Sequence, residues 1–68
     1  VENSIISRNV KIGRGAIIRN SIILSDSVVG ENVVVTHAVI DKYCLISDGV
    51  RIEGVKGTPK YIEQGKRL

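Results

Sequence analysis

The stretch Asn3-Ser4-Ile5-Ile6 decides the fold, because it returns twice at a fixed spacing of 17 residues. Its copies are Asn20-Ser21-Ile22-Ile23 and His37-Ala38-Val39-Ile40. A second stretch, Ile12-Gly13-Arg14-Gly15-Ala16, repeats with the same spacing at 29–33 and 46–50. A short period that covers a whole chain is typical of a solenoid, in which each repeat contacts only its neighbours.

The chain divides into three clear repeats and a weaker fourth, at residues 1–17, 18–34, 35–51 and 52–68. At 68 residues it is at most one small domain, and it contains no Trp, Phe or Met. Ile and Val dominate the apolar residues instead, and such β-branched side chains suit extended backbone. This composition favours a narrow interior filled layer by layer.

Within each repeat the apolar residues fall into three short bursts that alternate with period two, as in strands. Six columns of aliphatic or small residues are predicted to point inward. They are Val1, Ile18, Val35 and Ile52; Ser4, Ser21, Ala38 and Val55; Ile6, Ile23 and Ile40; Val10, Ser27 and Cys44; Ile12, Val29 and Ile46; and Ala16, Val33 and Val50.

Polar links separate the bursts, and in the first repeat these are Glu2-Asn3, Ser7-Arg8-Asn9 and Gly13-Arg14-Gly15. Gly and Asn tolerate positive φ, which a tight corner requires. One repeat is therefore strand and corner three times over, which makes a triangular coil. Stacked coils pair each strand with its copy one turn later. The sequence predicts an all-β, three-sided parallel β-helix of about four coils of 17 residues.

Each strand also has one residue that points outward. Two of the three outer rows contain charge: Lys11, Val28 and Leu45 form one, and Ile17, Val34 and Arg51 form the other. The third row is Ile5, Ile22 and Val39, followed by Lys56. A contiguous exposed apolar strip favours an interface, although β-branched residues also suit any strand. We predict a candidate interface at Ile5, Ile22 and Val39.

The repeat weakens after residue 53, so we expect coils over 1–53 and a decaying terminal coil or cap over 54–68. Pro59 denies a hydrogen-bond donor there. We expect Tyr61-Ile62-Glu63-Gln64-Gly65 to form a last strand and corner, one residue out of phase. Val1 begins in register without a capping repeat, and we expect an upstream domain of a longer protein.

Composition weighs against several function classes. The net charge of +3 is scattered rather than gathered on one face with aromatic residues, so nucleic-acid binding is not expected. No apolar run approaches the roughly 20 residues that span a bilayer, so no membrane partner is expected. The single Cys44 excludes an internal disulfide and favours a reducing compartment, with the cytoplasm as the expected location.

The residues that most often carry chemistry are interpreted here as structural. His37 is the only histidine and could act as a general base, but it occupies the corner column of Asn3 and Asn20. Cys44 shares an inward column. Three aspartates lie at corners, where Asp stabilises turns: Asp26, Asp41 and Asp48. We therefore predict no catalytic, cofactor-binding or metal-binding residue in this chain.

Pairs such as Ile6 with Val10 and Ile12 with Ala16 show an aliphatic residue followed four positions later by a small one. This pattern resembles the hexapeptide-repeat, left-handed parallel β-helix proteins, and the resemblance implies a left-handed winding. "VENSIISRNVKIGRGAIIRNSIILSDSVVGENVVV" looks like the C-terminal domain of bacterial glucose-1-phosphate adenylyltransferase. The closing "AVIDKYCLISDGVRIEGVKGTPKYIEQGKRL" is most similar to its GlgD-type subunit.

That resemblance implies a module for assembly and regulation in glycogen biosynthesis. Its partners would be its own N-terminal catalytic domain and other subunits. That upstream domain would use ATP and Mg²⁺ to form ADP-glucose and pyrophosphate from glucose 1-phosphate. The family's catalytic motifs match no position here. Two alternatives stay open, a hexapeptide-repeat acyltransferase and the β-helix of another sugar-nucleotide pyrophosphorylase.

Overall fold

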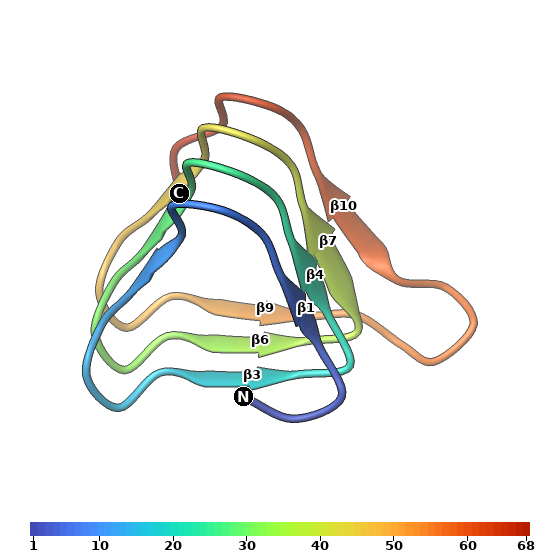
Figure 1. Ribbon diagram of the computed structural model, residues 1–68. Coiled ribbons are helices and arrows are strands. Elements are labelled where there is room, and N and C mark those ends of the chain that lie inside the picture. Colours follow the sequence, from blue (N-terminus) through green and yellow to red (C-terminus); the bar gives the residue numbers. More distant parts are fainter.

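The computed structural model describes residues 1–68 and contains strands only, arranged as the three walls of a triangular prism (Figure 1). One sheet has the order β1-β4-β7-β10 and comprises Ile5–Ile6 (β1), Ile22–Ile23 (β4), Ala38–Ile40 (β7) and Lys60–Ile62 (β10). The second comprises Lys11–Ile12 (β2), Val28–Val29 (β5) and Leu45–Ile46 (β8). The third comprises Ile17–Arg19 (β3), Val34–Thr36 (β6) and Arg51–Glu53 (β9).

Neighbouring strands come from successive turns of the chain, and all pair in parallel. Ile5 is opposite Ile22, which is opposite Val39. The same offset of 17 pairs Lys11 with Val28 in the second sheet. The predicted coil of 17 residues is confirmed, and the coils wind as a left-handed parallel β-helix. The chain has no helix of the length and apolarity that a membrane crossing requires.

The inward columns form the core, as the alternation predicts. The buried apolar residues are Ile18, Ile23, Val29, Val33, Val35, Ala38, Ile40, Cys44, Ile46 and Ile52. Their counterparts in the first coil are less buried, because a single neighbouring coil covers them: Ile6 and Ile12 are partly buried. Val1, which was predicted to point inward, is 67% exposed. Burial in this fold therefore depends on having a coil on both sides.

Two buried serines tie one coil to the next. The Ser21 hydroxyl donates to the Arg19 carbonyl (2.8 Å) and accepts from the Ala38 N–H (3.2 Å). The Ser27 hydroxyl donates to the Asp41 carbonyl and accepts from the Cys44 N–H (3.2 Å). These bonds satisfy the hydroxyls, and no buried side-chain nitrogen or oxygen is left without a partner.

Each corner places one residue in the left-handed region, at the same position in every coil. The three series are Asn3, Asn20 and His37; Asn9, Asp26 and Tyr43; and Gly15, Asn32 and Gly49. Asn, Asp and Gly adopt this conformation at low cost, whereas a bulky aromatic side chain does not. Tyr43, at φ 59°, is therefore the residue least suited to its corner.

The last coil departs from the predicted register. The 17-residue period would place Val55 opposite Ala38, but Lys60 lies there and Tyr61 lies opposite Val39. The expected inward Val55 is wrong, since this side chain is 68% exposed. The last strand was predicted to be one residue out of phase with the 17-residue period. This prediction is also wrong, because paired residues of the third and last coils are 22 positions apart, five more than the period.

A small hairpin causes this shift. Val55 and Thr58 exchange backbone hydrogen bonds (3.4 and 2.9 Å), and Gly57 between them has a φ of 88°. The five residues 55–59 form an excursion that leaves the prism beside β10 (Figure 1). The offset of 22 residues is kept after the hairpin: Leu45 is bridged to Arg67, and Gly65 occupies the next corner with a φ of 76°. The expected last strand and corner therefore exist, displaced by the length of the hairpin.

Candidate interaction surface

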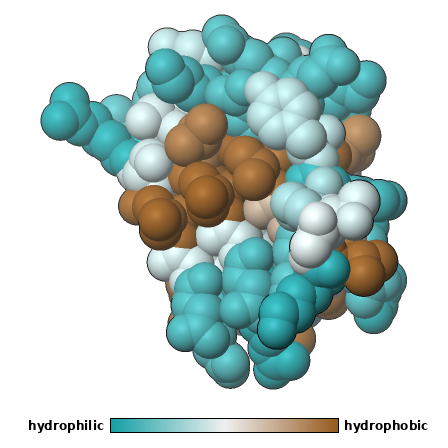
Figure 2. Space-filling model, turned by 90° about the vertical axis from the view of Figure 1, so that its right-hand side faces the viewer, coloured by the Kyte–Doolittle hydropathy of each residue, from teal (hydrophilic) through white to brown (hydrophobic).

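The three residues of the predicted interface lie side by side on the sheet β1-β4-β7-β10. Strand pairing puts Ile5, Ile22 and Val39 in one row across successive coils. Ile5 is 61% exposed, and the other two are half-buried. Figure 2 shows this wall of the prism, with apolar side chains gathered at its centre. The structure thus brings the predicted residues together; their role as an interface remains a prediction.

The row continues with a residue that the sequence period did not place there. Tyr61 pairs with Val39, so Tyr61 is the fourth member, in place of the expected Lys56. Its side chain is 59% exposed. We call Ile5, Ile22, Val39 and Tyr61 the apolar row. No charged side chain interrupts it from the first coil to the last.

Leu24 adds to this surface, although in the sequence it stands directly before the corner residues Ser25 and Asp26 and was not predicted to belong to a strand. It follows the inward Ile23, so alternation turns it to the same side as Ile22. Its N–H donates to the Ile40 carbonyl (2.8 Å), which keeps the backbone extended at this point. The sequence did contain a sign of this role. The equivalent residues one coil before and one coil after, Ser7 and Asp41, are polar, and only Leu24 is apolar.

The aromatic end of the row is held by a polar contact. The Tyr61 hydroxyl donates to the Asp41 carboxylate, which also accepts from the Lys42 N–H (2.7 Å). These two bonds lower the pKa of Asp41 from its usual 3.8. The bond to Asp41 raises the pKa of Tyr61 from its usual 10.0. The contact links the last coil to the third.

The other two walls interrupt their apolar side chains with charge. On β3-β6-β9 the outer row is Ile17, Val34 and Arg51, and Arg51 pairs with Glu53 (3.1 Å). On β2-β5-β8 the row begins with Lys11. The longest uncharged outer row is therefore the one on β1-β4-β7-β10.

The residues considered for chemistry lie apart from one another. His37 sits at a corner with φ 47°, and its carbonyl accepts from the Lys60 N–H (3.1 Å). Cys44 is 1% exposed, and its thiol lies 3.1 Å from the Glu63 carbonyl. Asp48 accepts from the Glu31 N–H (2.8 Å). No group of three or more His, Cys, Asp or Glu side chains is placed to hold a metal ion.

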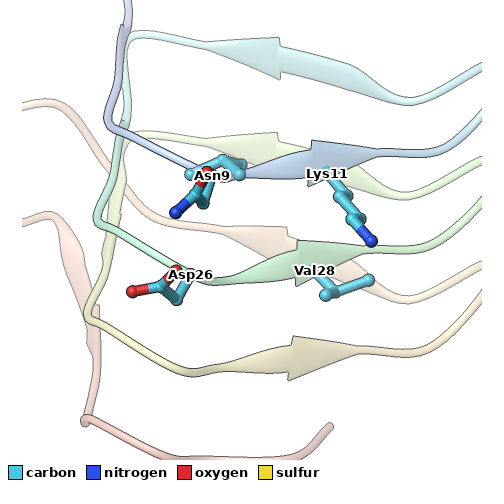
Figure 3. A pocket seen from close by; sticks show the side chains of 5 residues that line it. Asn9, Lys11, Asp26 and Val28 are labelled. Carbon is cyan, nitrogen blue, oxygen red and sulfur yellow. The ribbon is translucent and has the colours of Figure 1, made fainter.

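One depression opens on the wall β2-β5-β8, at the corner that leads into it. Asn9, Val10, Lys11, Asp26 and Val28 line it. Asn9 and Asp26 are stacked at the corner, and Lys11 and Val28 lie on neighbouring strands (Figure 3). The depression is open to solvent and lies on a different wall from the apolar row.

Comparisons with known proteins agree with the fold and with the resemblance to glucose-1-phosphate adenylyltransferases. The chain is 46% identical over 46 residues to glucose-1-phosphate adenylyltransferase 2 of Vibrio cholerae, which covers 68% of the chain. It is 37% identical over 47 residues to the glucose-1-phosphate adenylyltransferase of Corynebacterium diphtheriae, covering 69%. A probable mannose-1-phosphate guanyltransferase of Schizosaccharomyces pombe is 40% identical over 57 residues, or 84% of the chain.

The chain spans only a small part of these relatives, between 11% and 14% of their length. No solved structure matches it significantly. The family described as GlmU-like, C-terminal hexapeptide matches residues 1–58, which is most of the chain. The chain therefore belongs to the GlmU-like C-terminal hexapeptide family.

Proposed function

We propose that this chain is the assembly and regulatory β-helix of a glucose-1-phosphate adenylyltransferase subunit that acts in glycogen biosynthesis. The observation that carries the proposal is the apolar row, which crosses four coils without a charge. Similarity to several glucose-1-phosphate adenylyltransferases supports the choice of enzyme. The closing residues favour the GlgD-type subunit.

The size of the row favours a partner in the same polypeptide. The four strands of this wall comprise ten residues, and four of these form the apolar row. Stable complexes between free proteins use roughly 20–30 residues on each partner. A tether raises the effective concentration of a domain and compensates for a small contact. The proposed occupant is the protein's own N-terminal catalytic domain, and contacts with other subunits would enlarge the interface.

In this proposal the catalytic domain, not the β-helix, carries the reaction of ATP with glucose 1-phosphate. ATP and Mg²⁺ belong to that domain, and the proposed location is the cytoplasm. A second candidate, favoured by the similarity to a probable mannose-1-phosphate guanyltransferase, is the β-helix of a pyrophosphorylase for another sugar nucleotide. The two candidates share the β-helix and differ in the substrate of the catalytic domain.

The test uses the full-length protein that contains this chain. Ile22→Lys places a charge in the middle of the apolar row, and Ile17→Lys is the matched control on the wall β3-β6-β9. We expect Ile22→Lys to weaken docking of the catalytic domain on the β-helix, measured as faster limited proteolysis of the segment that joins them, and Ile17→Lys to leave the cleavage rate unchanged. Sedimentation velocity reports in addition whether assembly of the subunits is weakened. An unchanged cleavage rate in a folded Ile22→Lys variant would contradict the proposed interface.

Substrate choice is tested separately by pyrophosphate release. The full-length protein is offered ATP with glucose 1-phosphate, or GTP with mannose 1-phosphate. Turnover of the first pair is expected. Turnover of the second pair alone would replace the main proposal with the second candidate and would leave the interface prediction untouched.

A further inference from the structure

The wall β2-β5-β8 carries an outer row of different character. Strand pairing and the bridge from Leu45 to Arg67 order it as Lys11, Val28, Leu45 and Arg67. Val28 is 36% exposed and Leu45 is 40% exposed. Two aliphatic side chains therefore lie between two cations, and we call these four residues the cation-flanked row.

Both cations of this row are free. The chain contains two ion pairs, Arg19 with Glu2 and Arg51 with Glu53, and neither involves Lys11 or Arg67. The nearest acidic side chain in the depression is Asp26, and it forms no salt bridge with Lys11. In Figure 3 the Lys11 side chain extends along the prism towards Val28. The exposed apolar pair Val28 and Leu45 therefore has a positive charge at each end.

The positions directly beside this row carry short side chains or none. The residues that follow the inward aliphatic side chains here are Gly13, Gly30 and Ser47, whereas Leu24 and Asp41 occupy the same position on the wall of the apolar row. A Cβ atom on Gly13 would lie 2.6 Å from the backbone of Gly30, so close coil stacking excludes a side chain at Gly13. Beside Gly30 the space is filled by the Asp48 carboxylate, which accepts from the Glu31 N–H (2.8 Å). A partner backbone can therefore approach the row most closely at its Lys11 end, beside Gly13.

We propose that the cation-flanked row binds an extended acidic segment of a partner protein that lies along the prism axis. Coils are about 4.8 Å apart, so Lys11 and Arg67 stand three steps, or roughly 14 Å, from each other. An extended chain rises about 3.4 Å per residue, so side chains four positions apart span the same distance. The matching segment has two glutamates four positions apart and an aliphatic residue midway between them.

This pattern follows from charge and pleat together. In an extended segment, residues at positions one, three and five point to the same side. The glutamates then meet the two cations, and the central aliphatic residue meets Val28 and Leu45. Asp26, on the far wall of the depression, repels a third acid and accepts a hydrogen bond from an N–H or hydroxyl group. The inference is independent of the proposed enzyme, because it concerns a different wall of the prism.

The experiment titrates the ¹⁵N-labelled chain with a synthetic peptide that contains glutamate, threonine, isoleucine, threonine and glutamate in this order. The control peptide has the same residues reordered so that the isoleucine and the glutamates fall on opposite faces. We expect amide shifts centred on Lys11, Val28, Leu45 and Arg67 with the first peptide only. Sodium chloride at about 0.5 M should weaken the binding, because it screens exposed charges.

A double charge reversal decides the question. Lys11→Glu with Arg67→Glu should weaken binding about tenfold, because both attractions become repulsions. Lys56→Glu with Lys60→Glu makes the same change in net charge on and beside β10, in a different sheet, and should leave binding intact. Circular dichroism checks that both variants fold.

Equal binding by the Lys11/Arg67 variant would overturn the proposal, as would an equal loss in the Lys56/Lys60 control. Self-association of the Lys11/Arg67 variant without any peptide effect would also overturn it. In that case the two cations serve only to keep the edge strands from pairing with other chains.

Discussion

The two central coils and the last coil show the same alternation of inward and outward side chains, but they differ in the regularity of the 17-residue spacing. Residues 18–51 repeat without insertion, and their inward side chains, such as Ile23 and Ile40, are buried except for the partly buried Val50. The last coil accepts a hairpin of five residues, and its inward Ile62 is only partly buried. The coils that are covered on both sides keep the 17-residue register. The last coil has one neighbour; its hairpin loops out of the prism, and parallel strand pairing continues after it.

The comparison predicts its largest effect in the core. Ile40→Ala should lower the free energy of unfolding by about 2–5 kcal/mol, because it leaves a cavity between two coils. Ile62→Ala, in the same column of the last coil, should cost less than half as much, since Ile62 is already partly exposed. Urea denaturation followed by circular dichroism measures both. Equal losses would show that the last coil is as tightly packed as the third.

The serine that joins the second coil to the third should have the next largest effect. Ser27→Ala leaves the buried Cys44 N–H without its acceptor, so we expect a loss of about 1–3 kcal/mol. Ser25→Ala is the matched control, because the Ser25 side chain makes no hydrogen bond in the structure. Thermal unfolding of the two variants compares them. If Ser25→Ala lowered the stability as much as Ser27→Ala, the hydrogen bond from the Cys44 N–H to Ser27 would not be the cause of the loss.

The corner of the third coil should yield a gain in stability. Tyr43→Asn replaces an aromatic residue at φ 59° by one that suits the left-handed region. We expect a stabilisation of about 1 kcal/mol, at the lower end of the roughly 1–3 kcal/mol that such a conformation costs, because Asn still bears part of that cost. Asp26→Asn, at the same corner of the second coil, should change stability little. An unstable Tyr43→Asn variant would show that the exposed ring makes contacts that outweigh the strain.

The smallest effect concerns the polar contact between the third and last coils. The lowered pKa of Asp41 means that its contribution is complete above pH 3.8 and is lost as pH falls through the folded value. The raised pKa of Tyr61 means that its contribution is complete below pH 10.0 and is lost as pH rises through the folded value.

Tyr61→Phe should therefore lower stability slightly across the plateau between these limits and remove the contact's pH dependence at both ends. Urea unfolding across this pH range measures the effect. Tyr43→Phe serves as the control, because the Tyr43 hydroxyl has no hydrogen-bond partner. A pH profile of Tyr61→Phe identical to that of the parent chain would contradict a stabilising role for the contact.

Most of the candidate interface was readable from the sequence. Ile5, Ile22 and Val39 follow from two periods, two residues along a strand and 17 along the chain, and both are visible in the letters. The position of Tyr61 in the row was not predicted, because the 17-residue period does not indicate where an insertion interrupts it. Leu24 was missed because its neighbours Ser25 and Asp26 read as a corner, while its backbone remains extended through the bond to Ile40.

For the first three coils, the sequence by itself determined the coil length, the inward columns and the positions of the corners, because these depend on local alternation and on residues that tolerate positive φ. Only the tertiary structure decided the register of the last coil and the fourth member of the apolar row. These depend on the hydrogen bonds that Lys60 and Ile62 make with the third coil, and no local pattern specifies how many residues loop out before such bonds form.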